Sequence, residues 1–236
     1  MSIRMTDRNQ AIALYEQIAR MGNALNNPHR LRLLNLLCQC ERTVDSLAET
    51  LKLSIAIVSH HLQQLRRMRL VVSRKVGRNV TYAIADAEVT AFWLYFQNFC
   101  RGRVAELQLM GENLTAERKA RGTVDRDSLR KLMSKGDAVL WDLRPQVEFD
   151  AGHLPGAVCC PFPSLAESIK NAPSNKTVVL YCRGPYCVLG DLAQEQLVAR
   201  GIKALLLSDG VPEWASAGLP VKRSPNYHSI FSPAPI

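Results

Sequence analysis

Three short apolar runs in the second half of the chain constrain the possible folds more than any other feature. The runs span residues 138–142, 177–181 and 204–207. Segments with helical patterns alternate with them, at residues 125–135, 164–171 and 191–200. Strands that are apolar throughout and alternate with helices indicate a parallel sheet covered on both faces. The second half is therefore predicted to be an α/β domain whose ligands bind beyond the carboxyl ends of its strands.

The first half of the chain has a different rhythm, because its apolar residues recur at spacings of three and four. The residues Tyr15, Ile18, Met21 and Leu25 form one such stripe. Helices are predicted at residues 7–25, from Pro28 onward, at 44–51, and from the N-cap Ser54 to about Met68. A tight turn at residues 51–53 joins the last two helices, so this half is mainly α and contains a helix-turn-helix.

The fourth predicted helix has two distinct faces. Its apolar face, predicted to point inward, carries Ile55, Val58, Leu62 and Leu65. Its other face begins with small, hydrogen-bonding side chains and ends with arginines, an order that suits base edges and then phosphates in a DNA major groove. The predicted DNA contacts on this helix are Ser54, Ala56, Ser59, His60, Gln63, Gln64, Arg66 and Arg67.

A basic β-hairpin is predicted directly after this helix. Its strands are residues 70–75 and 79–84, and Arg74, Lys75 and Arg78 lie near its tip. Such a hairpin can act as a wing that grips the DNA backbone or the minor groove. The alternative is a helical bundle with a solvated basic face and a hairpin of no function, but the cap, the amphipathic helix and the basic hairpin occur in the order that DNA binding requires.

The distribution of charge agrees with a polyanionic partner for the first half. Residues 1–120 contain 17 Lys and Arg against 10 Asp and Glu, a net charge of +7 out of the +9 of the whole chain of 236 residues. A charged segment at 117–122 follows the first half and is interpreted as a linker. The predicted organisation is a DNA-binding and dimerisation domain at 1–115, a linker at 116–122, an α/β domain at 123–223 and a tail at 224–236.

The sequence also predicts a soluble, cytoplasmic protein with no membrane partner. Charged residues such as Arg4, Asp7 and Arg8 interrupt the first thirty positions, and the uncharged aromatic stretch from Val89 to Cys100 is too short to span a bilayer. In such a compartment the seven cysteines are expected to be thiols, available for catalysis, metal binding or redox sensing.

The first half resembles the arsenic-repressor (ArsR) family of winged-helix transcriptional repressors. The resemblance rests on the motifs Asn27–Leu34, Val44–Ala48, Val58–Leu62 and the hairpin residues Gly77–Tyr82. It implies a homodimer bound to a palindromic operator in double-stranded DNA, with the first helix and a C-terminal helix forming the dimer interface. A long apolar stripe through residues 89–114 is suited to that partner helix.

Members of this family sense metals or reactive sulfur, and Cys38, Cys40 and Cys100 are the candidate sensor thiols here. A metal site would use Cys38 and Cys40, with Cys100 as a third ligand. However, Thr43 and Asp45 occupy the positions at which the arsenic-sensing members of the family have their cysteines. No metal or other cofactor is therefore predicted. A disulfide or polysulfide between Cys38 and Cys100 is a second possibility. The third is that these thiols are small buried hydrophobic residues.

Two thiols in the segment Cys182–Cys187 lie where a parallel sheet places its ligands. Cys182 ends the run at 177–181, Gly184 and Pro185 force a tight curve, and a helix begins near Val188. The backbone N–H groups of residues 183–187 and the helix dipole can hold an anion and lower the pKa of a thiol. Cys187 adds a second thiol within range of disulfide or persulfide exchange.

The second half resembles the rhodanese family of sulfurtransferases. The matching motifs are Asp142–Phe149 with Gly152–Ala157, Cys182–Cys187, and Asp209–Trp214 with Gly218–Val221. The resemblance implies that Cys182 accepts a sulfane sulfur as a persulfide and that Asp142 and Arg144 brace the site. The loop that would hold the sulfur consists of Arg183, Gly184, Pro185, Tyr186 and Cys187.

Cys187 departs from the rhodanese pattern, because the family often has arginine or another polar residue at this position to help bind thiosulfate. Thiosulfate, polysulfide, glutathione persulfide and protein persulfides therefore stay open as donors. Cys159 and Cys160, which follow Gly156 in a probable strand, are interpreted as packing residues.

Taken together, the motifs predict a dimeric, sulfur-responsive repressor whose rhodanese domain forms a persulfide on Cys182 and passes the signal to DNA binding. One alternative is a sulfurtransferase, moving sulfur from thiosulfate or a persulfide to cyanide or a thiol, that the DNA-binding domain only localises. Another is a metal- or arsenic-responsive repressor with an inactive rhodanese domain.

Overall fold

The computed structural model describes residues 8–173 and 175–231. The chain divides into two compact units, one running to Val89 and including the segment from Ile230, and one from Thr90 to Ser229. This division falls within the first turn of α5 (Ala87–Arg101), the first of the two helices that connect the sequence halves. The domain limits at 115 and 123 stay a prediction.

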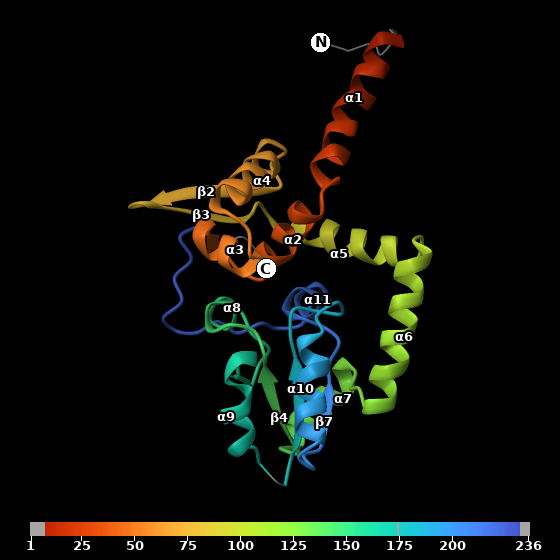
Figure 1. Cartoon of the computed structure of the whole chain (residues 1–236), viewed down its shortest axis with the longest axis vertical. Helices are drawn as coiled ribbons and strands as arrows, with labels where there is room; N and C mark the ends of the chain where they lie inside the picture. The colour runs from red at the N-terminus through yellow and green to blue at the C-terminus, as the bar shows by residue number, and fades with distance from the viewer. Residues whose placement is uncertain (1–7, 174, 232–236) are drawn as a thin grey trace. The chain divides into compact units, whose positions relative to one another are not determined.

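The first unit is a winged helix-turn-helix, as predicted (Figure 1). Its helices are α1 (Arg8–Leu25), α2 (Pro28–Leu37), α3 (Val44–Leu51) and α4 (Ile55–Arg67). Its antiparallel sheet has the order β1 (Arg42–Thr43), β3 (Asn79–Ile84), β2 (Val71–Val76). Strand β1 was not predicted, because two residues are too few to show a strand pattern.

Side-chain caps fix where these helices begin. Asn27 Oδ1 accepts hydrogen bonds from the backbone N–H groups of His29 and Arg30 at 3.0 and 3.2 Å, directly before Pro28 opens α2. Ser54 Oγ accepts from Ile57 N at the start of α4, and Lys52 adopts a left-handed conformation with φ of 55° in the turn before it. These local contacts explain why the helix-turn-helix was readable from sequence.

The inward stripe of α4 begins one turn later than predicted. Val58, Leu62 and Leu65 are fully buried, but Ile55 is 54% exposed. Ile55 is the first residue of α4, and the core reached by the later turns does not extend to this end of the helix. The prediction that Ile55 packs inward was therefore wrong.

The apolar stripe at 89–114 lies on two helices rather than one. They are α5 (Ala87–Arg101) and α6 (Ala105–Arg121), separated by residues 102–104. The charged segment that was interpreted as a linker is also mostly helical, since residues 117–121 form the last turns of α6. The helix ends at Gly122, whose φ of 106° favours glycine.

The rest of the second unit is an α/β domain with a parallel sheet, as predicted. The strands have the order β5 (Ala157–Cys159), β4 (Ala138–Asp142), β6 (Thr177–Tyr181), β7 (Ala204–Leu206). The helices are α7 (Arg126–Lys135), α8 (Gln146–Ala151), α9 (Leu165–Lys170), α10 (Leu189–Val198) and α11 (Val211–Ser216), with a 3₁₀ turn η1 at Phe162–Ser164.

Alternate residues of each strand enter two separate cores. Val178 and Leu180 of β6 pack with residues of α9 and α10, whereas Val179 and Tyr181 pack with residues of α7 and α11. Both faces of the sheet are therefore covered, which explains why its strands are apolar throughout. Cys160 packs in the first of these cores at 2% exposure. Cys159 is half-buried, and burial raises its pKa to about 11.

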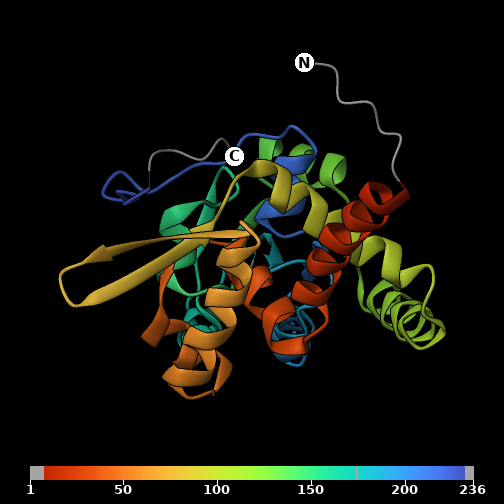
Figure 2. The same ribbon diagram turned by 90° about the horizontal axis from the view of Figure 1, so that it is seen from above.

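Two further features of the described residues concern surfaces. The β2–β3 hairpin extends away from the helices of its unit, with Gly77 in a left-handed conformation at its tip (Figure 2). Among the residues that the structure describes, no helix combines the length and apolar character needed to cross a membrane.

Candidate functional site

The predicted DNA contacts of the first unit lie on an accessible surface. Of the eleven residues predicted on α4 and the hairpin, nine are exposed and only Ser59 and Gln64 are half-buried. Arg66 also donates to Ser73 Oγ at 2.9 Å, a bond that ties α4 to β2. Arg74 is engaged by the segment after Ser229, because it donates to the carbonyl of Ile230 and lies 5.6 Å from the ring centre of Phe231.

The two adjacent histidines of α4 have different environments. His60 is exposed, whereas His61 is half-buried with its ring 5.5 Å from that of His29. Burial and the charge of Arg30 lower the pKa of His61. His60 is therefore accessible to a partner, as predicted for a DNA contact, whereas His61 packs.

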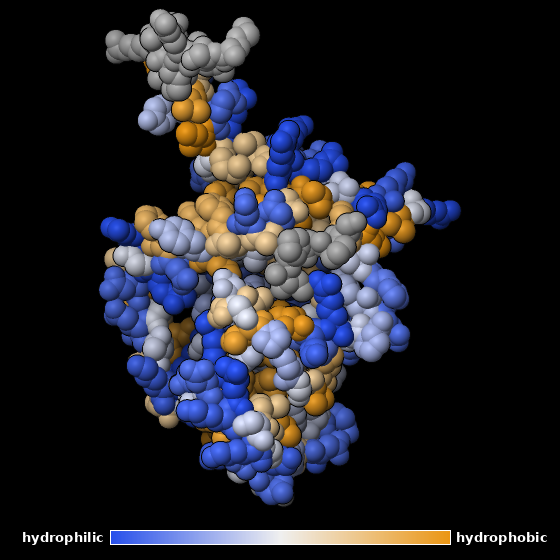
Figure 3. Space-filling view, turned by 180° about the vertical axis from the view of Figure 1, so that it is seen from behind, coloured by the Kyte–Doolittle hydropathy of each residue, from blue (hydrophilic) through white to orange (hydrophobic). Residues whose placement is uncertain are grey.

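Large apolar side chains are exposed on α1, α5 and α6. On α1 they are Ile12, Leu14, Tyr15 and Ile18, which are 50–70% exposed, and Figure 3 shows this helix as a largely orange stripe at the top. On α5 and α6 they are Phe92, Tyr95, Phe99, Leu109 and Met110. Contiguous apolar side chains on a single protomer mark a surface that another protein covers.

Each of the seven cysteines is present as a thiol rather than in a disulfide. Of the candidate sensor thiols, Cys40 is buried, whereas Cys38 and Cys100 are half-buried. Over residues 8–173 and 175–231, no group of three or more His, Cys, Asp or Glu side chains is placed to hold a metal ion.

The loop after β6 is folded tightly against the start of α11. Gly184 has φ of 104°, and a Cβ there would lie 2.7 Å from a carboxylate oxygen of Glu213. A Cβ on Gly210 would lie 2.7 Å from Gly184 N and 2.9 Å from the Cys182 carbonyl oxygen. Gly210 is therefore required by the close approach of the loop backbone, and Gly184 by its left-handed conformation, which disfavours any side chain. Burial raises the pKa of Glu213, which lies beneath the loop.

The two thiols of this loop are in direct contact. Cys182 is 4% exposed, Cys187 is half-buried, and their Sγ atoms are 2.8 Å apart. The hydrogen bond between the sulfurs lowers the pKa of Cys187 to about 6 and raises that of Cys182 well above its ordinary value. Cys187 is therefore the more readily ionised thiol of the pair, and the two thiols titrate together because they share a hydrogen bond.

Arg183, the second residue of the loop, is held by a carboxylate that was not predicted. Its Nε and Nη2 atoms donate to both carboxylate oxygens of Glu148 at 2.7–3.1 Å, and Glu148 is fully buried in α8. Glu148 lies within the motif Asp142–Phe149, but nothing local in the sequence pairs it with a residue 35 positions later. The bidentate geometry fixes the direction of the Arg183 side chain.

Asp142 and Arg144 form a second buried ion pair beneath the loop. Arg144 Nη2 donates to Asp142 at 2.6 Å and to the carbonyl of Gly152 at 2.6 Å, and both charged residues are fully buried. Tyr181, the residue before Cys182, donates its hydroxyl to Asp142 at 2.5 Å. Burial, followed by the charge of Asp142, raises the pKa of Tyr181. This network holds the end of β6, from which the loop departs.

Tyr186, at the tip of the loop, contacts α5. Its hydroxyl donates to the carbonyl of Gln97 at 3.3 Å and accepts from Arg101 Nε at 3.2 Å. The Arg101 guanidinium also lies 5.0 Å from the centre of the Tyr186 ring. The carbonyl groups of Pro185 and Cys187 accept hydrogen bonds from Arg118 of α6. The loop therefore contacts both connecting helices, α5 and α6.

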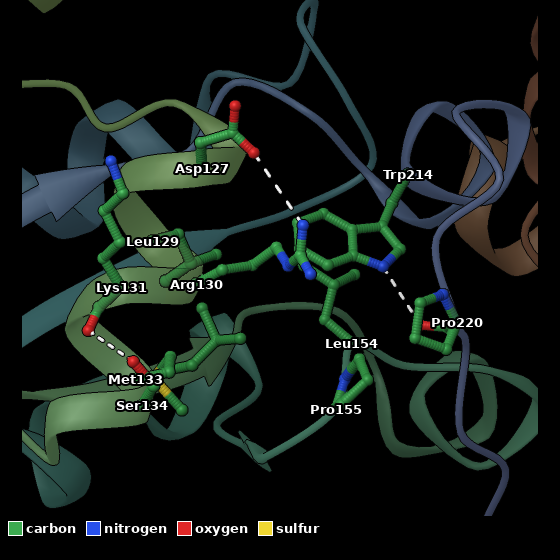
Figure 4. Close-up of a pocket in the computed structure, with 11 residues that line it drawn as sticks. Asp127, Leu129, Arg130, Lys131, Met133, Ser134, Leu154, Pro155, Trp214 and Pro220 are labelled. Carbon is green, nitrogen blue, oxygen red and sulfur yellow. Dashed lines mark hydrogen bonds and ion pairs between the residues drawn. The ribbon is translucent and has the colours of Figure 1, made fainter.

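A separate cavity of about 640 Å³ lies on the α7 side of the sheet (Figure 4). It is lined by α7 side chains together with Leu154, Pro155 and Trp214, whose indole N–H donates to the carbonyl of Pro220 at 3.0 Å. Its lining includes none of residues 182–187, so it is distinct from the loop of the two thiols.

Two family models match the chain, one in each half. The model of the bacterial regulatory protein, arsR family, matches residues 27–73, and that of the rhodanese-like domain matches residues 125–217. The second match includes the loop at 182–187 and the ion pair of Asp142 and Arg144.

One relative is similar along almost the whole chain. The HTH-type transcriptional regulator Rv0324 of Mycobacterium tuberculosis is 34% identical over 209 residues, which cover 89% of this chain and 92% of the relative. Both domains are therefore shared with a protein of similar length.

Two solved structures are similar to one half each. The homodimeric winged helix-turn-helix DNA-binding domain of Mb0332 from Mycobacterium bovis is 33% identical, covers 45% of this chain and 95% of that structure, and has a TM-score of 0.40. A rhodanese-related protein from Thermoplasma volcanium is 20% identical, covers 43% of this chain and 97% of that structure, and has a TM-score of 0.39.

Proposed function

We propose that this chain regulates transcription in response to sulfane sulfur that its rhodanese-like domain captures. The chain belongs to the ArsR family of DNA-binding transcriptional regulators and carries a rhodanese-like domain. The observation that carries the proposal is the 2.8 Å separation of Cys182 Sγ and Cys187 Sγ in the loop after β6. One ionised thiol beside a protonated one is suited to accept sulfur and then to react again.

The chemistry has two steps, written here for a hydropersulfide donor RSSH. In the first step, the Cys182 proton passes to Cys187 along the hydrogen bond between the two sulfurs, the Cys182 thiolate attacks the terminal sulfur of the donor, and the donor S–S bond breaks. The leaving thiolate takes the proton from Cys187 and departs as RSH. Cys182 then holds the persulfide Cys182–S–SH. In the second step, Cys187 attacks Cys182 Sγ, the Cys182–Cys187 disulfide forms, and H₂S leaves. The sum is two thiols and RSSH giving one disulfide, RSH and H₂S.

The charges around the loop favour a donor with little negative charge. Arg183 is paired with Glu148, and Arg144 is paired with Asp142, so these two cations are already neutralised. Cys187 stands where many rhodaneses have a polar or cationic residue for thiosulfate. We therefore infer that the donor is a hydropersulfide or an organic polysulfide rather than the thiosulfate dianion.

The DNA-binding half of the proposal uses α4 and the hairpin. The exposed face of α4 would enter the major groove, with His60 and Gln63 reaching base edges, and Arg67 and Arg78 contacting phosphates. The exposed apolar side chains of α1 and α5 favour a homodimer, and a twofold dimer requires a palindromic operator. Cys38 and Cys100 stay candidate receivers of the sulfur signal.

A binding titration tests the proposed signal. The full-length protein would be titrated by fluorescence anisotropy against a duplex selected from a random pool, before and after treatment with polysulfide. We expect polysulfide to change the affinity on the order of tenfold or more, and Cys182→Ser to abolish the change without altering binding in the reduced state. Cys159→Ser, a thiol outside the loop, is the matched control and should respond as the natural chain does.

Two results would contradict the proposal. If Cys182→Ser responds to polysulfide like the natural chain, the rhodanese-like loop is not the sensor. If the protein instead transfers sulfur from thiosulfate to cyanide over many turnovers, with DNA affinity unchanged, the second domain is a sulfurtransferase that the DNA-binding domain only localises.

A further inference from the structure

A buried arginine of α6, outside the matched rhodanese-like region, is held in place by an acid of α10. Arg118 is 5% exposed and Asp191 is 6% exposed. Arg118 donates to both carboxylate oxygens of Asp191, through Nε at 2.9 and 3.2 Å and through Nη2 at 2.7 Å. Bidentate geometry of this kind fixes the plane of the guanidinium.

The remaining donors of Arg118 reach the backbone of the thiol loop. Nη1 donates to the carbonyl of Pro185 at 2.8 Å, and Nη2 donates to the carbonyl of Cys187 at 3.2 Å. All described peptide bonds are trans, and in a planar trans peptide the next N–H points opposite to the carbonyl. Arg118 therefore turns the N–H groups of Tyr186 and Val188 away from itself. Tyr186 belongs to the segment 183–187 whose N–H groups are predicted to hold an anion, and Val188 directly follows it.

The neighbouring arginine shares the acid but not the loop. Arg121 donates to Asp191 at 2.7 Å and to Glu195 at 3.0 Å. Burial alone would raise the pKa of Asp191, but the hydrogen bonds and charges of Arg118 and Arg121 hold it below its ordinary value. Arg121 thus has the same charge as Arg118 and the same carboxylate partner. It differs because its guanidinium donates only to carboxylate side chains and not to the carbonyls of the loop.

We propose that Arg118 is a positioning residue for the Cys182 loop and that, through its two carbonyl bonds, the state of the loop acts on α6. The second part rests on the proposed function. The two Sγ atoms are 2.8 Å apart, and a disulfide bond is about 2.05 Å long, so oxidation shortens this separation by roughly 0.8 Å. The part of this change that the side-chain torsions do not absorb displaces the backbone of residues 182–187, which weakens the hydrogen bonds from Arg118 and loosens α6.

The contact of Tyr186 with α5 gives the same loop a second link. Tyr186 bonds to Gln97 and Arg101, the latter adjacent to Cys100. Both connecting helices therefore contact residues 185–187, which comprise the second thiol, Cys187, and the two residues before it. Arg118 is the stronger of the two links, because it is buried and makes charge-assisted bonds, whereas Tyr186 is 45% exposed.

The positioning role is tested by the pH profile of thiol alkylation in the full-length protein. Iodoacetamide labelling of the peptide that contains residues 182–187 would be followed by mass spectrometry from pH 5 to pH 9. We expect Arg118→Met to slow labelling at neutral pH on the order of tenfold and to move the midpoint upward, because the loop loses oriented N–H donors. Arg118→Lys should restore part of the rate.

Arg121→Met is the matched control, since it removes the same charge from the same carboxylate. Its labelling profile should stay close to that of the natural chain. If Arg121→Met and Arg118→Met shift the profile equally, Arg118 acts only through its charge, and the positioning role is overturned. An unchanged profile in Arg118→Met also overturns it, and Arg118→Lys provides the same test if Arg118→Met does not fold. Labelling needs no sulfur donor or DNA, so this result is independent of the proposed function.

The coupling to α6 is tested by hydrogen exchange. Amide exchange of residues 112–121 would be compared in the reduced protein and after polysulfide has formed the disulfide. We expect exchange there to accelerate severalfold in the natural chain and in Arg121→Met. In Arg118→Met it should be fast in both states, with no further change. Equal acceleration in Arg118→Met, or none in the natural chain, would overturn the coupling.

Discussion

The two units place their candidate functional residues in opposite environments. On α4 and the hairpin, nine of eleven predicted DNA contacts are exposed, and the charges of Arg67, Lys75 and Arg78 are accessible to a partner. Around the thiol loop, by contrast, Asp142, Arg144 and Glu148 are fully buried and each is paired. On a surface that binds a polyanion, the cationic side chains are exposed to solvent. In a site that must orient a backbone loop, the charged side chains form hydrogen bonds and ion pairs within the protein. Substitutions should therefore affect binding in the first unit, and both stability and chemistry in the second.

The largest effect is expected from breaking the buried ion pair of the second unit. Arg144→Met leaves Asp142 charged and unpaired in a buried position, which should lower the free energy of unfolding of that domain by about 3–5 kcal/mol. Calorimetry would measure it as a fall in the melting temperature of the α/β domain. Lys170→Met, which breaks an exposed pair of similar length with Glu167, is the control and should leave the melting temperature unchanged.

The next effect concerns the shared proton of the loop. In the natural chain, labelling of the loop thiols should rise through a midpoint near pH 6, because the pKa of Cys187 is lowered to about 6. Cys187→Ala removes the hydrogen-bond partner and leaves the buried Cys182 alone, so the midpoint should rise to about 8.5 or above. Cys159→Ala should keep the original midpoint. A midpoint near pH 6 without Cys187 would show that the two sulfurs do not share the charge.

A smaller effect is expected from removing one exposed cation of the hairpin. Arg78→Ala should weaken DNA binding severalfold on all sequences alike and reduce the slope of log affinity against log salt by about one, since one phosphate contact is lost. Its thermal stability should be unchanged. Arg200 is an exposed cation just after α10 in the second unit, and Arg200→Ala should alter neither quantity. A loss confined to one DNA sequence would instead assign Arg78 to base recognition.

The smallest effect is expected at a helix cap. Asn27→Ala removes the acceptor for the N–H groups of His29 and Arg30 and should destabilise the first unit by about 1 kcal/mol. Chemical denaturation followed by circular dichroism would measure it. The exposed neighbour Asn26, changed to alanine, provides the comparison. If both substitutions cost the same, the cap is not the reason that α2 begins at Pro28.

Local signals explain what could be predicted from the sequence. Pro28 at the start of α2, the cap at Ser54, helical spacing in α4, and apolar runs at β4 and β6 depend on neighbours within a few positions. They located the helix-turn-helix, the hairpin, the parallel sheet and the thiol loop. The errors arose where the outcome depends on distant contacts. Ile55 fits the apolar stripe but has no core to enter, and the apolar residues at 89–114 are divided between two helices.

The sequence by itself therefore determined which elements form, in what order, and which loop carries the two thiols, because backbone preferences and side-chain periodicity are local. Only the tertiary structure decided which residues support that loop. Glu148 meets Arg183, and Arg118 meets Asp191 and the loop carbonyls, across 35 to 73 positions of chain. Such pairings depend on how the helices pack around the sheet. They cannot be predicted from the charges of the residues or from their spacing along the chain.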